Sequence, residues 1–170
     1  MGDIAIKKIK IALDTSCLNA KKEDSVLNKL EDLREKEIIE LYTSTVNEKE
    51  QIEKNPNKKW REKYLKRINE EHKVLETGIW GKSKWGNFVW GNKNVNNILR
   101  DIFGKGNIIG NYDVWLLKTA IVHRCDYFLT LNSRHFIENG RREQIEKLGI
   151  KVREPNDDFL REVESVCEIN

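Results

Sequence analysis

This sequence contains few cysteines and no long hydrophobic run. Only three of its 170 residues are cysteine, Cys17, Cys125 and Cys167, and no two of them form a C-x-x-C pair. An odd number without such a pair argues against a disulfide framework or a zinc site and fits a reducing cytoplasm. No apolar stretch approaches the roughly 18 residues that a membrane span requires. Because lysines interrupt the apolar segment at residues 4–13, it does not resemble a signal peptide, and we expect a cytoplasmic protein with no membrane partner.

Two sequence signatures of phosphate chemistry are absent. No G-x-x-x-x-G-K-[ST] motif occurs, so a P-loop ATPase is not indicated. A phosphatase or phosphotransferase with Asp-x-Asp after its first strand is also disfavoured, because Ser16 stands where the second Asp would be.

Charge is unevenly distributed along a polar chain. Charged residues make up 35% of the sequence and hydrophobic ones 38%, while the formal net charge is only +3. Residues 54–105 carry 13 Lys and Arg against 5 Asp and Glu, whereas residues 21–53 carry 6 against 10. The basic segment suits a nucleic-acid backbone, although a solvated lysine-rich helix explains the same composition.

The hydrophobic pattern alternates between strands and helices. Short apolar runs predict strands at residues 9–14, 38–43, 108–109, 127–131 and 150–152. Helical spacing predicts helices at residues 25–37, from about 46 through 76 with a break near 55–57, and at 94–103, 112–124, 135–147 and 157–166. Such alternation predicts an α/β fold with a central parallel sheet covered by helices on both faces. We expect a single domain over residues 1–170, with a basic, tryptophan-rich, helical insertion at about 54–105.

Acidic residues stand near the predicted carboxyl ends of the strands, where open α/β sheets bind their ligands. Asp14 ends the first strand, Glu48 lies one turn into a helix, Asp113 opens a later helix, and Asn132 follows the strand at 127–131. If the first strand neighbours the strand at 127–131, these side chains converge on one cleft. Clustered carboxylates suit a hard cation such as Mg²⁺, because a bound divalent ion relieves their repulsion and activates a water against a phosphate.

Four segments, taken in order, resemble the motifs of PIN domains. They are Leu13–Ser16, Thr43–Glu48, Tyr112–Leu116 and Cys125–Phe136, and the closing segment 152–160 also ends as those domains do. The resemblance covers about 9–53 and 106–162 but not the central insertion. It implies a three-layer α/β/α fold and a hydrolysis of phosphodiester bonds, usually in RNA, that depends on Mg²⁺ or Mn²⁺. Many family members are toxins of bacterial toxin–antitoxin pairs, which implies single-stranded or structured RNA, an antitoxin protein and a second copy of the chain as partners.

The resemblance also implies roles for individual residues. The metal ligands would be Asp14, Glu48 and Asp113, and the hydroxyl groups of Thr130 and Ser16 would support them. The fourth acidic position of the family falls on Asn132, whose carbonyl oxygen carries no charge, so we expect a weaker metal site. This departure keeps open a second function, that of a catalytically weakened PIN-fold module which binds RNA or a protein without cutting.

Each of these residues also has a structural explanation. Asp14 can cap the helix that follows it, and Glu48 completes a capping box with Thr45. Asp113 lies in the first turn of a helix, where a carboxylate favours the helix dipole, and Asn132 can simply shape a turn. Capping and metal binding are compatible, because both place the carboxylates at the same edge of the sheet.

The central insertion repeats tryptophan and glycine every five residues, at Trp80, Trp85 and Trp90. Lys82 and Lys84 lie between the first two tryptophans, and Lys93 follows the third. Aromatic rings beside lysines suit base stacking and phosphate attraction on a single strand, although the rings can equally pack the insertion onto the domain or form a dimer contact. The candidate nucleic-acid contacts are Lys82, Lys84, Trp85 and Arg134. The three histidines show no metal-ligand or catalytic-triad spacing, so we expect structural roles for them, and only His135 closely follows the Asn132 segment.

Overall fold

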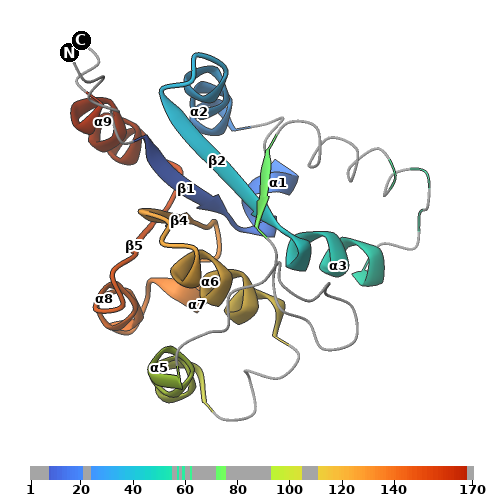
Figure 1. Ribbon diagram of the computed structural model, residues 1–170, viewed down its shortest axis with the longest axis vertical. Helices are drawn as coiled ribbons and strands as arrows, with labels where there is room; N and C mark the ends of the chain where they lie inside the picture. The colour runs from blue at the N-terminus through green and yellow to red at the C-terminus, as the bar shows by residue number, and fades with distance from the viewer. Residues whose placement is uncertain are drawn as a thin grey trace, which may run out of the picture.

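The computed structural model describes residues 8–20, 24–54, 57, 59, 62, 72–75, 93–104 and 111–167, leaving aside the side chains of residues 48, 49, 51, 93 and 94. Within these residues, the sheet strands are β1 (Ile9–Leu13), β2 (Ile39–Ser44), β3 (Lys73–Leu75), β4 (Tyr127–Leu129) and β5 (Lys151–Arg153). Their order is β3-β2-β1-β4-β5 and every neighbouring pair is parallel, so β1 lies at the centre (Figure 1). The predicted central parallel sheet is therefore confirmed.

Helices surround this sheet and begin at polar caps. The described helices are α1 (Thr15–Ala20), α2 (Ser25–Glu35), α3 (Thr45–Lys54), α5 (Lys93–Phe103), α6 (Tyr112–Val122), α7 (Ser133–Phe136), α8 (Arg141–Glu146) and α9 (Asp157–Val166). Asp24, Asn111 and Asn156 each accept a backbone N–H of the first turn, in α2, α6 and α9 respectively. These side chains replace hydrogen bonds that the first turn of a helix lacks, which fixes where the three helices begin.

Hydrophobic side chains pack on both faces of the sheet and give the fold three layers. On one face, Ile11, Leu13 and Leu129 pack against α1, α2 and α9. On the other face, Ala12 and Phe128, which alternate with them along β1 and β4, pack against α3, α5, α6, α7 and α8. Because successive side chains of a strand point to opposite faces, the apolar central strands contribute to both cores. Figure 1 shows α2 and α9 on one side of the sheet and α5, α6 and α8 on the other.

Two segments differ from the helices predicted for them. Residues 73–75 form strand β3, because their backbone pairs with β2 from Tyr42 to Ser44, and this pairing outweighs the local helical pattern. The helix predicted at 135–147 is interrupted, since Asn139 and Gly140 adopt φ angles of 59° and 74° between α7 and α8. The strand predicted at 108–109 lies outside the described residues.

Part of the predicted insertion belongs to the core of the domain. β3 extends the sheet next to β2, and Leu99 and Phe103 of α5 are buried in the second core. Much of the remaining range 54–105 lies outside the described residues, so a separate arm stays a prediction. Among the helices that the structure describes, none is long and apolar enough to cross a membrane.

A charged cluster joins β4, β5 and α9. Glu162 of α9 accepts hydrogen bonds from Arg153 Nε at 2.9 Å, Lys151 Nζ at 2.9 Å and the Tyr127 hydroxyl at 3.0 Å. Burial alone would raise the pKa of Glu162, but these donors outweigh it and lower the pKa to about 2. The ionised carboxylate therefore ties α9 to the two strands.

We predict that Glu162→Gln destabilises the fold at pH 7 by on the order of 1–3 kcal/mol. The folded-state pKa of this carboxyl is lower than its ordinary value of 4.5, so its contribution to stability is present above that value and is lost as the pH falls through about 2. Urea unfolding should therefore show a smaller gap between variant and wild type at pH 3 than at pH 7. Glu164→Gln, on the same helix, is the control, and equal losses from both variants would contradict the prediction.

Candidate functional site

The strand order places the carboxyl ends of β1 and β4 side by side. β1 lies between β2 and β4, so the chain crosses from one side of β1 to the other, and open α/β sheets form their ligand crevice at such a reversal. Leu13 is paired with Leu129, and Asp14 and Thr130 follow directly. The condition set for a common cleft, that the first strand neighbours the strand at 127–131, is therefore met.

Asp14 is a buried carboxylate that three donors hold in place. It is only 2% exposed. Its Oδ2 accepts hydrogen bonds from the hydroxyls of Ser16 (2.6 Å) and Thr130 (2.8 Å), and its Oδ1 accepts one from the backbone N–H of Thr15 (2.7 Å). Burial raises the pKa of Asp14 to about 6, and the charge of Asp113 adds to this effect, while the hydrogen bonds oppose it. A helix cap does not require such burial, which favours a further role for this carboxylate.

Asp113 lies in the first turn of α6, close enough for its charge to raise the pKa of Asp14. The cap residue Asn111 accepts the backbone N–H of Asp113 at 3.0 Å and so fixes the start of the helix. Oδ2 of Asp113 accepts a hydrogen bond from Nδ2 of Asn132 at 3.4 Å and lies 2.8 Å from Nδ1 of His135. The predicted site therefore includes a histidine for which we expected only a structural role.

Glu50 of α3 is a second buried carboxylate, which the sequence analysis missed. It is 5% exposed, and its Oε2 accepts a hydrogen bond from the hydroxyl of Thr15, the residue after Asp14, at 2.6 Å. Asn47 donates to the same hydroxyl at 2.9 Å, while its own carbonyl accepts the N–H of Ser44 at 2.8 Å, where β2 ends. Asn47 and Glu50 are three residues apart and share one face of α3. This spacing after the end of a strand is the signal that could have identified Glu50.

The other predicted site residues divide into two groups. Ser16 and Thr130 are at the site, both bonded to Asp14, while Arg134 is exposed on α7. The side chain of Glu48 lies outside what the structure describes, and so do Lys82, Lys84 and Trp85. The structure places the first group only, and the functional roles of both groups stay predictions.

The donor chemistry of the site fits a hard divalent cation. Asp14 and Asp113 offer carboxylate oxygens. The pKa of Asp14 is raised mainly by burial and further by the charge of Asp113, and a cation would relieve that repulsion. Within the described part of the chain, no three Asp, Glu, His or Cys side chains form a ready-made metal group. Mg²⁺ is usually bound by only one or two carboxylates and keeps several waters, so the residues present suit that ion.

Two solved structures share this architecture. VapBC2 from Rickettsia felis, bound to a DNA fragment from its promoter, matches with 15% identity and a TM-score of 0.54 over 86% of this chain and 98% of that chain. DNA-bound VapBC from Salmonella typhimurium matches with 19% identity and a TM-score of 0.59 over 87% of this chain and 99% of that chain. In both, the matching protein is VapC, which is a PIN domain. This chain has a PIN-domain fold.

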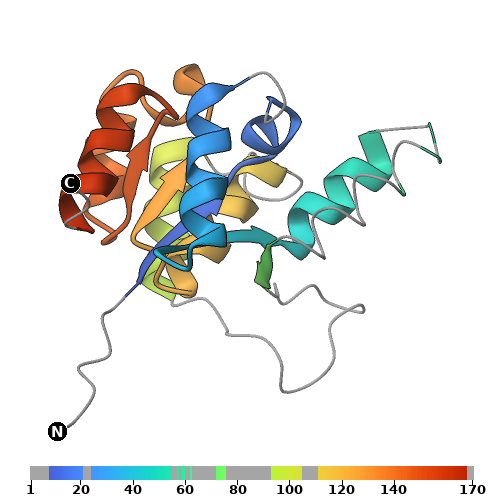
Figure 2. The same cartoon turned by 90° about the horizontal axis from the view of Figure 1, so that it is seen from above.

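The PIN fold is evident from architecture rather than from sequence similarity. No protein-family model matches the sequence, and no curated protein matches it significantly. At such low identity the likeness shows the fold and leaves function to be argued from the site. In this PIN fold, α1 and α3 begin where β1 and β2 end, and Figure 2 shows α3 continuing outward from the end of β2. The first turns of these helices therefore supply residues to the carboxyl edge of the sheet.

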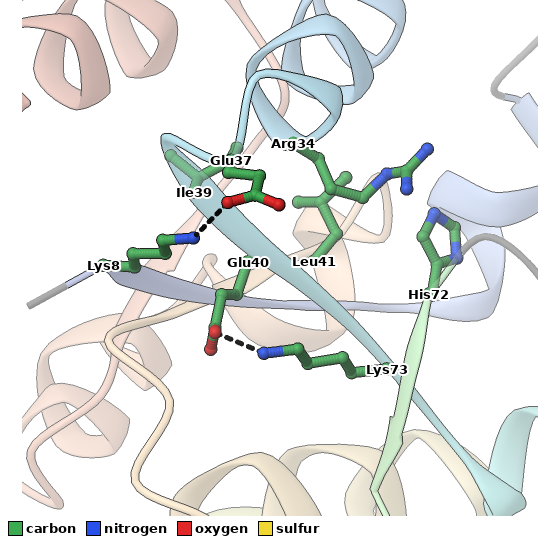
Figure 3. A pocket seen from close by; sticks show the side chains of 8 residues that line it. All are labelled: Lys8, Arg34, Glu37, Ile39, Glu40, Leu41, His72 and Lys73. Carbon is green, nitrogen blue, oxygen red and sulfur yellow. Dashed lines mark hydrogen bonds and ion pairs between the residues drawn. The ribbon is translucent and has the colours of Figure 1, made fainter.

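A cavity of about 350 Å³ lies near the amino ends of β1 and β2, at the opposite edge of the PIN fold (Figure 3). The charged and polar groups around it pair with one another: Lys8 with Glu37 at 3.4 Å, His72 with Glu31 at 2.6 Å, and Lys73 with Glu40. These pairs join α2 and β3 to the sheet. The charged groups there are already paired, although the buried Nδ1 of His72 has no hydrogen-bond partner among the described residues. The carboxyl edge with its clustered aspartates is therefore the better candidate site.

We predict that Thr15→Val destabilises the fold by about 1–3 kcal/mol, because it deprives buried Asn47 and Glu50 of their shared partner. Thr43 provides a matched control, since it is 2% exposed and its hydroxyl has no hydrogen-bond partner among the described residues. Thr43→Val should be neutral or stabilising, as no hydrogen bond is lost. Urea unfolding of both variants measures the difference, and equal losses would show that the Thr15 hydroxyl has no special role.

Proposed function

We propose that this chain is a metal-dependent endoribonuclease, which hydrolyses phosphodiester bonds in RNA and acts as the toxin of a toxin–antitoxin pair. The observation that carries the proposal is the linkage of Asp14 and Asp113 at the carboxyl edge of a PIN fold, where Thr130 donates to Asp14, and Asn132 donates both to Thr130 and to Asp113. Burial of Asp14, together with the nearby charge of Asp113, opposes ionisation of Asp14 and raises its pKa. Such an arrangement is costly unless a cation or a substrate uses it, which supports a catalytic role.

In this proposal, some residues would bind the metal ion and others would orient those ligands. Asp14 and Asp113 would hold a Mg²⁺ or Mn²⁺ ion, which when bound supplies an activated water and neutralises charge on the phosphate. Ser16 and Thr130 orient Asp14 by donating to its Oδ2. Asn132 contributes an amide in place of a fourth carboxylate. From the PIN resemblance, we expect products that end in a 3′-hydroxyl and a 5′-phosphate.

Two glutamates of α3 compete for the remaining acidic position. Glu48 is the position that the PIN resemblance implies, whereas Glu50 is buried beside the residue that follows Asp14. Lys54 pairs with Glu50, whose hydrogen bond is the main cause of the raised pKa of the lysine. The charges of Asp113 and Asp14 also contribute to that rise, which supports a position of Glu50 near both aspartates. We therefore propose Glu50 as the third acid of the site.

Partners are proposed from the resemblance and the two structural matches. Both matches are VapBC complexes with DNA, and many PIN domains are toxins held by an antitoxin. We propose that RNA is the substrate, that an antitoxin protein binds this chain, and that two copies of it associate. The basic segment at 54–105 would attract the RNA backbone.

A PIN-fold module that binds RNA or a protein without cutting is the second candidate function. Asn132 favours it, because an amide at the fourth acidic position adds no charge to attract a cation. A site with fewer charges binds a divalent ion less tightly, and a protein can then keep the fold and its partners while losing catalysis.

The purified chain should cleave labelled single-stranded RNA with Mn²⁺ and not with EDTA, and Asp14→Asn should slow cleavage at least about 100-fold. A bound divalent ion contributes several kcal/mol, and each 1.4 kcal/mol is about tenfold in rate. Asp126→Asn is the matched control, since Asp126 lies at the amino end of β4 and accepts the N–H of Lys10 at 2.9 Å. Full activity of Asp14→Asn would show that the carboxylate of Asp14 has no role in cleavage. Binding of RNA without cleavage under any metal would favour the second candidate.

Glu50→Gln and Glu48→Gln separate the two glutamates of α3. We expect Glu50→Gln to lower Mn²⁺-dependent cleavage by about tenfold or more, and Glu48→Gln to have the smaller effect. Glutamine keeps a carbonyl oxygen that can accept the hydroxyl hydrogen bond of Thr15, so thermal unfolding should show that both variants are folded. If Glu48→Gln lowered cleavage more than Glu50→Gln, Glu48 would be the third acid of the site.

A further inference from the structure

One carboxylate oxygen of Asp113 contacts two side chains from the segment that follows β4. Nδ1 of His135 lies 2.8 Å from Oδ2, and Nδ2 of Asn132 lies 3.4 Å from the same oxygen. No hydrogen bond goes to Oδ1 from the residues that the structure describes. The two carboxylate oxygens of Asp113 are therefore distinguished from one another, and Oδ1 is the one left for a cation.

The ring of His135 is held in a fixed direction. It packs edge-on against Phe103 of α5, with the ring centroids 5.2 Å apart, and lies 4.9 Å from the ring of buried Phe136. Arg141 donates to the backbone carbonyl of His135 at 3.1 Å. With the ring confined in this way, Nδ1 is directed at Asp113, and a contact of that length with a carboxylate requires that Nδ1 carry the hydrogen.

We infer that His135 is a positioning residue that holds Asp113 for the metal, an inference that rests on the proposed function. Its Nδ1–H donates to Oδ2 and fixes the rotation of the carboxylate. Oδ1 would then be the oxygen that Asp113 offers to a bound cation. Groups that orient a metal ligand in this way commonly change metal affinity by 10- to 100-fold when they are removed.

The same geometry gives Asn132 a function that a carboxylate could not have. An amide nitrogen donates to Oδ2 of Asp113, whereas an acid at this position would set one carboxylate against another. The segment from Asn132 to His135 therefore presents two donors to the ligand. Asn132 would then orient Asp113, the proposed metal ligand, and would not itself bind the metal.

The alternative is that His135 serves only to fill the aromatic cluster around Phe103 and Phe136, and two substitutions separate these roles. His135→Phe keeps an aromatic ring for packing but has no donor. His135→Asn loses the ring but places an amide nitrogen at the same distance along the side chain as Nδ1. A positioning role and a packing role thus predict opposite orders for the two variants.

The experiment measures Mn²⁺ binding to metal-stripped full-length protein from the electron paramagnetic resonance signal of free Mn²⁺, together with thermal unfolding. We expect His135→Phe to bind Mn²⁺ about tenfold more weakly than wild type while keeping its unfolding temperature. His135→Asn should bind within about twofold of wild type, although it unfolds at a lower temperature.

Three outcomes would overturn the inference. Wild-type affinity in His135→Phe would leave no role for the donor, and equal weakening in both variants would show that the ring alone matters. Absence of Mn²⁺ binding in the wild type would remove the proposed nuclease itself and this inference with it. Because wild-type binding is measured first, failure of the proposed function is distinguished from failure of the role of His135.

Discussion

The parallel pairing of β1 with β4 is the constraint on which the site depends. Leu13 is in register with Leu129, and the N–H of Asp14 donates to the carbonyl of Leu129 at 2.9 Å, so the hydrogen bonding continues one residue beyond β1. This register brings the hydroxyl of Thr130 to the carboxylate of Asp14. A slip of one residue would turn that side chain to the other face of the sheet, and the carboxylate of Asp14 would lose the donor from Thr130.

The fold was predictable where strands are buried on both faces. β1, with Ile11, Ala12 and Leu13, forms a continuous apolar run because each face of it meets a helical layer. β3 was not predictable in this way, because it is an edge strand of three residues with Val74 36% exposed, set in a strongly charged segment. Only its pairing with β2, which is not local in sequence, makes it a strand.

The site was predictable at strand ends and less so on helices. The positions of Asp14 and Thr130 could be predicted because these residues come directly after the ends of β1 and β4. Glu50 depends instead on the phase of α3, in which the buried face contains Asn47 and therefore the residue three positions later. His135 depends on packing against Phe103, which no local pattern around the histidine reveals. Site residues that follow the end of a strand can be predicted from a sequence. Those whose place depends on helix phase or on packing against distant residues can be identified only once the fold is known.

The hydrogen bond between Thr130 and Asp14 joins residues 116 positions apart in the chain. During synthesis on the ribosome, Asp14 emerges long before Thr130, Asp113 and His135 have been made. Until β4 can add to the sheet, its carboxylate lacks the hydrogen bond from Thr130. Any nuclease activity of this edge therefore requires that synthesis has passed Thr130, and a shorter nascent chain lacks the completed site.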